Sequence, residues 1–108
     1  MSRMRGLTIL VATADPARFH AALSLAASQA ALGGRARLHL QSEAVALLDP
    51  GCSDLTALRD EAVALGVEFT ACQTGLAERG GTALPPGVEA DGLLGLLTSL
   101  GEDRMVVF

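Results

Sequence analysis

Cys72 is the residue whose type and position most clearly suggest chemistry. It follows the strand-like segment Val67-Glu68-Phe69-Thr70-Ala71 and precedes a short predicted helix over residues 73–79. A thiol at a helix N-terminus lies among backbone N–H groups without intrahelical partners, and their partial positive charge favours the thiolate. Position alone leaves two interpretations open, a reactive thiolate or a buried structural thiol, because free cysteine is among the most buried residue types.

Polar residues follow two other predicted strands in the same way. In a parallel sheet the carboxyl ends of the strands meet at one edge, and ligands of such sheets bind there, near a topological switch point. We therefore expect these residues to share an edge with Cys72. The candidate binding residues at this edge are Thr13, Gln41, Gln73 and Thr74.

The elements that would position these residues alternate between strand and helix. The pattern predicts strands at 7–12, 35–41, 67–71, 88–89 and 104–108, and helices at 16–32, 42–48, 55–65, 73–79 and 92–100. No two strands are separated by a hairpin turn, which indicates an α/β protein with a mostly parallel sheet. We expect a three-layer α/β/α, flavodoxin-like fold of about five strands, formed by residues 1–108 as one domain.

Two strands differ in their pattern. The segment 7–12 is continuously apolar, which is typical of a strand buried on both faces of a parallel sheet. The segment 35–41 alternates polar and apolar residues, with His39 on the polar side, so we expect it to lie nearer an edge.

Asp15 and Pro16, which lie between these two segments, predict a helix start, with Asp15 as the cap and proline at the first helical position.

Several other chemistries are disfavoured. Cys52, Cys72, His20 and His39 have no paired ligand spacing, so we expect no metal site. The loop after the first strand is not rich in glycine, and Asp15 would repel a nucleotide phosphate at the helix start. No elbow motif holds a serine nucleophile. We therefore expect no cofactor.

Composition restricts the partners and the location. The net charge is −4, all eight basic residues are arginine and only three residues are aromatic, which argues against nucleic acid as a partner. No apolar run reaches the roughly 18 residues of a membrane span, and the N-terminus lacks a signal-peptide pattern. We expect a cytoplasmic protein with reduced thiols. The hydrophobic fraction of 50% indicates that some apolar surface is buried between subunits.

Cys52 lies in a Pro-Gly-Cys-Ser loop. Loops tolerate variation, so a thiol without function is the favoured interpretation. The alternative is a resolving cysteine for Cys72, which requires the two Cα atoms to lie within about 7 Å of each other.

The segment Ala71-Cys72-Gln73-Thr74-Gly75-Leu76, with Gly66-Val67-Glu68-Phe69 before it and Gly87-Val88-Glu89 and 93–108 after it, resembles the DsrE/DsrF-like family. The likeness covers essentially the whole chain. It implies a small cytoplasmic α/β protein that assembles as a homotrimer or as part of a larger hetero-oligomer. It further implies that Cys72 relays sulfur as a persulfide between a donor and an acceptor protein, although other members keep the cysteine without a known activity.

The sequence departs from the DsrE/DsrF-like pattern in the segment that would hold a sulfur acceptor. Arg79-Gly80-Gly81 and a proline-rich loop follow Cys72, and they form neither a basic cluster nor an aromatic lid that would hold an acceptor. The identity of the partner therefore stays open. The alternative function is a non-catalytic, oligomeric binding or regulatory protein in which Cys72 is structural.

Overall fold

The computed structural model describes residues 4–49, 53–80 and 84–108, in which strands and helices alternate. The elements are β1 (Leu7–Val11), α1 (Pro16–Ala31), β2 (Ala36–Leu40), the 3-10 helix η1 (Ser42–Leu48), α2 (Ser53–Ala64), β3 (Glu68–Cys72), α3 (Gln73–Glu78), β4 (Val88–Asp91), α4 (Leu93–Thr98) and β5 (Arg104–Val107). Their ends agree with the sequence-based expectation within about two residues. Among the described residues, no helix has both the length and the apolar character required to cross a membrane.

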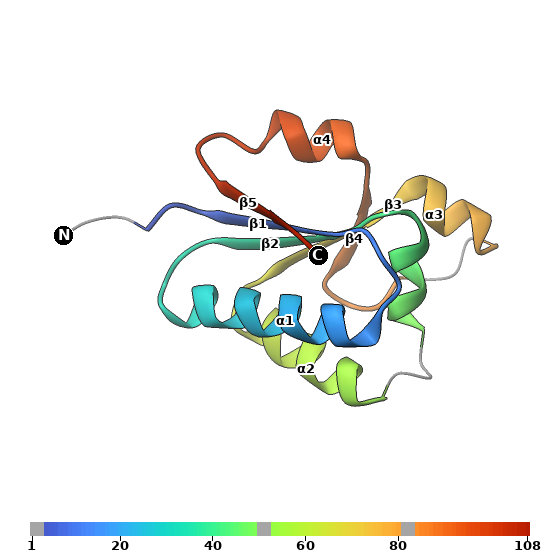
Figure 1. Cartoon of the computed structure of the whole chain (residues 1–108), viewed down its shortest axis with the longest axis horizontal. Helices are drawn as coiled ribbons and strands as arrows, with labels where there is room; N and C mark the ends of the chain where they lie inside the picture. Colours follow the sequence, from blue (N-terminus) through green and yellow to red (C-terminus); the bar gives the residue numbers. More distant parts are fainter. Residues whose placement is uncertain (1–3, 50–52, 81–83) are drawn as a thin grey trace.

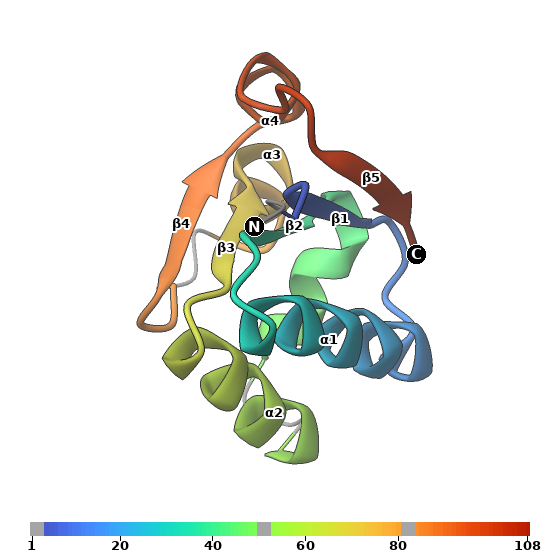
Figure 2. The ribbon, with the colours of Figure 1, turned by 90° about the vertical axis from the view of Figure 1, so that its left-hand side faces the viewer.

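The strands of this region form one parallel sheet in the order β4-β3-β2-β1-β5. Helices α1 and α2 cover one face, and α4 crosses the opposite face on its way from β4 to β5 (Figures 1 and 2). This arrangement confirms the predicted α/β fold with a flavodoxin-like, three-layer architecture. Because η1 and α3 follow directly on β2 and β3, both begin at the same edge of the sheet, and they pack against each other.

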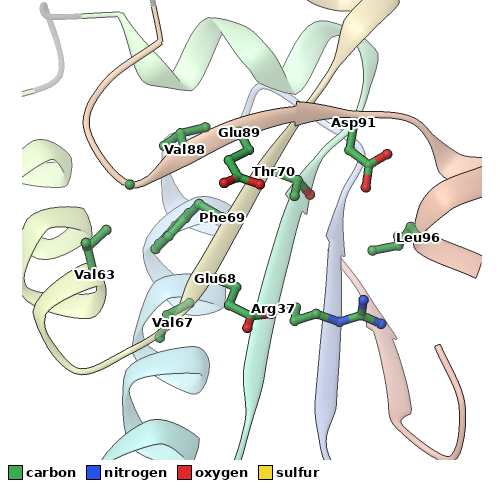
Figure 3. Close-up of a pocket in the computed structure, with 11 residues that line it drawn as sticks. Arg37, Val63, Val67, Glu68, Phe69, Thr70, Val88, Glu89, Asp91 and Leu96 are labelled. Atoms are coloured by element: carbon green, nitrogen blue, oxygen red, sulfur yellow. The ribbon is translucent and has the colours of Figure 1, made fainter. Parts of the chain in front are cut away.

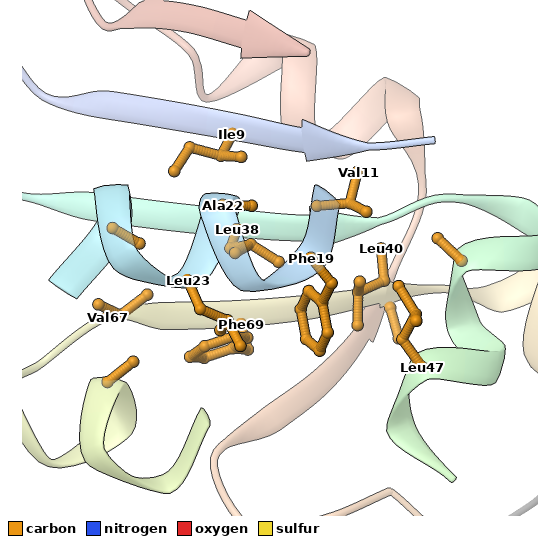
Figure 4. Close-up of a cluster of buried hydrophobic side chains, with 14 of the residues drawn as sticks. Ile9, Val11, Phe19, Ala22, Leu23, Leu38, Leu40, Leu47, Val67 and Phe69 are labelled. Carbon is orange, nitrogen blue, oxygen red and sulfur yellow. The ribbon is translucent and has the colours of Figure 1, made fainter. Parts of the chain in front are cut away.

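The face under α1 and α2 carries the hydrophobic core (Figure 4). Ile9, Leu38 and Phe69 lie in register on three adjacent strands and meet Phe19 and Leu23 of α1. All five side chains are buried. Burial of a large apolar side chain stabilises a fold by about 1.5–3 kcal/mol, so this face supplies much of the stability.

β2 is a central strand with β1 on one side and β3 on the other, so the expectation that it lies nearer an edge is wrong. Its alternation reflects the two faces of the sheet instead. Leu38 and Leu40 belong to the core, whereas the intervening Arg37 and His39 belong to the side that α4 crosses. Both polar side chains are largely removed from water and hydrogen-bonded, as buried polar groups must be.

Asp103 connects the turn after α4 to β1 and β2. Its side chain is 5% exposed and accepts hydrogen bonds from Thr8 Oγ1 (2.8 Å) and Arg35 Nη2 (2.5 Å). Arg37 Nη2 lies 3.6 Å from the carboxylate, and Arg37 Nη1 donates to Ser99 Oγ at 2.6 Å. Burial alone would raise the pKa of the Asp103 carboxyl, but hydrogen bonds from Arg35 and Thr8 and the charges of both arginines lower it by more.

The variant Asp103→Asn tests this cluster. Because the folded-state pKa of Asp103 lies below its ordinary value of about 3.9, its stabilising contribution is present above that pH and is lost as the pH falls through the lowered pKa. Urea unfolding should show a loss of about 2–3 kcal/mol at pH 7 and a smaller difference from wild type near pH 2. The exposed neighbour Glu102→Gln serves as control. An equal deficit of Asp103→Asn at both pH values would contradict the role assigned to its charge.

Candidate functional site

Cys72 is the last residue of β3 and the N-cap of α3, which confirms its expected place at a strand end and a helix start. Its Sγ accepts a hydrogen bond from the backbone N–H of Gly75 at 3.5 Å. The sulfur thus takes the position that a serine or aspartate oxygen occupies in an ordinary N-cap. The residue is only 6% exposed, which restricts the access of a reaction partner.

The first turn of α3 lies directly against the start of η1. A Cβ atom on Gly75 would come within 2.5 Å of the Ser42 carbonyl oxygen and 3.0 Å of Val45 Cγ2, so a residue with a side chain does not fit there without movement. Ser42 has a φ of +53°, in the left-handed region that non-glycine residues rarely adopt. This close approach brings the Ser42 backbone to Cys72, where the Ser42 N–H lowers the pKa of the thiol.

The electrostatics of the Cys72 thiol are dominated by backbone dipoles. Burial raises its pKa, but hydrogen bonds from the N–H groups of Gly75, Ser42 and Thr74 lower it, and the negative charge of Glu78 has a small raising effect. The net result is a pKa below the ordinary cysteine value. Backbone N–H groups that converge in this way favour a negative charge, here on the sulfur itself.

The other predicted site residues lie at the carboxyl ends of β1, β2 and β3. Gln73 and Thr74 are exposed next to Cys72 at the start of α3. Gln41 is half-buried after β2, and its Oε1 atom lies 2.9 Å from His39 Nε2. Thr13 follows β1, two strands away from β3, and its Oγ1 atom is buried without a hydrogen-bond partner in the described part of the chain.

The sheet order separates Cys72 from the switch point. β1 leads through α1 to β2 on one side, while its other neighbour β5 is reached from β4 through α4 on the opposite face. The switch point therefore lies between β1 and β5, near Thr13, whereas Cys72 ends β3. The structure brings the Gln41–Ser42 segment to Cys72, but leaves Thr13 apart.

Other candidates from the sequence contribute less to this site. Cys52 lies outside the described residues, so its relation to Cys72 stays a prediction. His20 is exposed on α1. Across residues 4–49, 53–80 and 84–108, no three histidine, cysteine, aspartate or glutamate side chains are grouped so as to hold a metal ion.

Two contributors to the site were not recognised in the sequence: the Ser42 backbone and Gly75. The left-handed conformation of Ser42 has no signal in its residue type, because it results from contact with a distant helix. Gly75 was visible as a glycine inside the first turn of a predicted helix, which often marks a close approach between two backbones. His39 was placed correctly on the polar side of its strand, but its complete burial was not expected.

A groove of about 550 Å³ opens beside β3 and β4 (Figure 3). Glu68, Thr70, Glu89 and Asp91 contribute to its lining from these two strands. Leu96 of α4 lies at one end. Cys72 does not line the groove, although it is the register partner of Asp91. The groove and the thiol are therefore neighbouring but separate features.

No family model and no curated protein matches the sequence. Several solved structures share the fold, and two of them cover nearly the whole chain. The ychN protein from E. coli matches with a TM-score of 0.78 at 24% identity, over 97% of this chain and 100% of that chain. A conserved protein of unknown function from Bacteroides thetaiotaomicron matches with a TM-score of 0.79 at 19% identity, over 95% and 94% of the two chains. These similarities establish a shared fold and carry no activity to this chain.

Proposed function

We propose that this protein is a cytoplasmic, DsrE/DsrF-like sulfur carrier that accepts a sulfane sulfur on Cys72. The observation that carries the proposal is the set of backbone N–H groups from Ser42, Thr74 and Gly75 around the thiol sulfur. These donors stabilise a negatively charged sulfur without a metal or a second cysteine. The sequence resemblance around Cys72 supports the same function.

The reaction is an exchange between sulfur atoms. The Cys72 thiolate attacks the outer sulfur of a donor persulfide, R–S–SH, and a new S–S bond forms while the donor S–S bond breaks. The donor leaves as the thiolate R–S⁻, and Cys72 carries –S–SH, so atoms, charge and oxidation level balance. An acceptor thiolate then attacks the outer sulfur on Cys72 in the same way. The exposed Gln73 and Thr74 are the residues that a docked donor or acceptor protein would contact first.

We propose further that the protein assembles with copies of itself, with a homotrimer as the favoured state. Its support is a group of exposed apolar side chains on α4 and β5, namely Leu93, Leu94, Leu97, Met105 and Val107. Apolar side chains that gather on neighbouring elements often mark a protein interface. A trimer is the state that the DsrE/DsrF-like resemblance implies.

The second candidate is a non-catalytic, oligomeric binding or regulatory protein with a structural Cys72. The observation that favours it is the small exposed fraction of Cys72, together with the role of its sulfur as a helix cap. In this case the thiol stabilises the junction of β3 and α3 and takes no part in sulfur transfer.

Incubation with a small persulfide donor tests the transfer reaction. Wild type and the control variant Cys52→Ser should each gain about 32 Da, the mass of one sulfur atom, as measured by intact-mass spectrometry. Cys72→Ser should gain less than either, because its hydroxyl is not a nucleophile for sulfane sulfur at neutral pH and Cys52 is then the one thiol left in the sequence. Equal loading of Cys72→Ser and wild type would remove the proposal.

The pH dependence of alkylation separates the two candidates. In Cys52→Ser, Cys72 is the remaining thiol of the sequence. The alkylation rate of the folded protein should reach half its maximum at a lower pH than that of the urea-unfolded chain, because the backbone donors lower the folded-state pKa. Slow alkylation of the folded protein with an unshifted midpoint would favour the structural role.

Light scattering after size exclusion tests the assembly. Wild type at micromolar concentration should have a mass well above the 11.0 kDa of one chain, and Leu94→Glu should reduce it by placing a charge in the apolar interface. The matched control is Leu32→Glu, because Leu32 at the end of α1 is 73% exposed and Leu94 is 79% exposed. A wild-type mass equal to one chain would contradict self-assembly.

A further inference from the structure

His39 is a buried titratable residue for which the sulfur exchange supplies no role. It lies on β2 with an exposed fraction of 0%, and its ring is held at both nitrogens. Nδ1 is 2.7 Å from Thr70 Oγ1 on β3, and Nε2 is 2.9 Å from Gln41 Oε1. Two hydrogen bonds in a buried position fix the orientation of the ring.

The two hydrogen-bond partners of the His39 ring show which ring nitrogen carries the hydrogen. The Gln41 Oε1 atom can only accept, so His39 Nε2 carries the hydrogen and donates it to Gln41. Nδ1 of the neutral ring then accepts the hydrogen of the Thr70 hydroxyl. Burial lowers the pKa of His39 more than the bond to Gln41 and the charge of Asp91 raise it, which keeps the ring neutral near pH 7. The imidazole therefore acts as a fixed hydrogen-bond donor to the Gln41 side chain.

Gln41 is held by its backbone as well as by its side chain. Its N–H donates to the Val11 carbonyl at 2.9 Å, and its own carbonyl accepts from Ala44 N–H at 3.0 Å. The peptide group that follows carries this carbonyl at one end and the Ser42 N–H at the other. The orientation of that single peptide plane therefore determines where the Ser42 N–H points.

The Ser42 conformation requires support from its surroundings. The left-handed region is unfavourable for a non-glycine residue, and such a conformation persists only when neighbouring contacts enforce it. On one side the backbone of Ser42 is packed against Gly75 at the start of α3. On the other side its neighbour Gln41 is anchored by the buried His39 ring.

We propose that His39 is a positioning residue for the Cys72 thiol: by holding the Gln41 side chain, it fixes the peptide plane that directs the Ser42 N–H to the sulfur. The role of His39 rests on the proposed function in one respect: sulfur transfer is the reaction that the positioned thiol would perform. His39 touches neither the sulfur nor a substrate, and its effect passes through the Gln41–Ser42 backbone. The thiolate is thus supported by a second strand, β2, in addition to the helix that it caps.

The test is the pH midpoint of Cys72 alkylation, measured in the Cys52→Ser background. Gln41→Ala removes the anchor and leaves the buried ring in place, so this variant is expected to fold. Its midpoint should rise by about 0.5–1 pH unit, the equivalent of up to one lost hydrogen bond to a charged group. His39→Leu should raise the midpoint by the same amount, and the double variant should shift it no further, because both substitutions break one chain of contacts.

The matched control is Gln29→Ala. Gln29 is also a glutamine whose amide fixes a turn, since its Nε2 donates to the Arg5 and Arg35 carbonyls at 2.8 and 3.3 Å. These residues flank the amino ends of β1 and β2, away from Cys72. The control should lose stability without a shift of the Cys72 midpoint. A midpoint unchanged in Gln41→Ala, or moved equally by Gln29→Ala, would overturn the proposal.

Failure of this inference is distinguishable from failure of sulfur transfer. The alkylation midpoint depends on the thiolate alone and needs no sulfur donor. A wild-type protein that takes up no sulfur but shows the shift in Gln41→Ala would remove the proposed function and keep the role of His39. If His39→Leu does not fold, the comparison of Gln41→Ala with Gln29→Ala still decides the outcome.

Discussion

The buried carboxylate of Asp103 is the contact on which the polar side of the sheet depends. Helix α4 has only six residues and would not be stable alone. It is held because Arg37 bridges from β2 to both Ser99 and Asp103 on either side of the turn that follows α4. The same carboxylate receives the Thr8 hydroxyl from β1. The Asp103 carboxylate therefore connects the turn after α4 to the central strands β1 and β2. This connection holds β5, which follows the turn, beside β1.

The two faces of the sheet thus serve different purposes. The apolar face under α1 and α2 contributes stability through the burial of apolar surface, an effect that is large but has no directional preference. The opposite face contains arginine, histidine, threonine and carboxylate side chains whose bonds are directional, so it fixes geometry. The Cys72 thiol lies at the carboxyl end of β3, where η1 and α3 meet, and hydrogen bonds from backbone N–H groups lower its pKa. Fixed dipoles of this kind need no reorganisation when charge develops on the sulfur.

The sequence allowed the elements and the position of Cys72 to be predicted, because glycines and caps separate the strands from the helices. Asp15 and Pro16 did begin the first helix, with Asp15 Oδ1 accepting from Ala17 N–H at 2.9 Å. The place of β2 was predicted wrongly, because alternation describes a strand with one polar face and does not reveal whether that face is covered. The left-handed Ser42 and its contact with Gly75 were beyond prediction, since they arise from the packing of η1 against α3.

The pairing of β1 with both β2 and β5 has a consequence for the order in which the fold forms. β2 follows β1 after one helix, whereas Leu7 of β1 finds its second neighbour, Arg104, only after every other element has been made. During synthesis, one edge of β1, the most apolar strand, therefore stays unpaired until β5 has been made. No other pair of neighbouring strands in the described sheet is separated by so much of the chain. Contacts so distant in sequence form slowly, and an open apolar edge invites pairing with other chains. The nascent protein is consequently most exposed to misassembly at β1, far from the cysteine that would give the finished protein its chemistry.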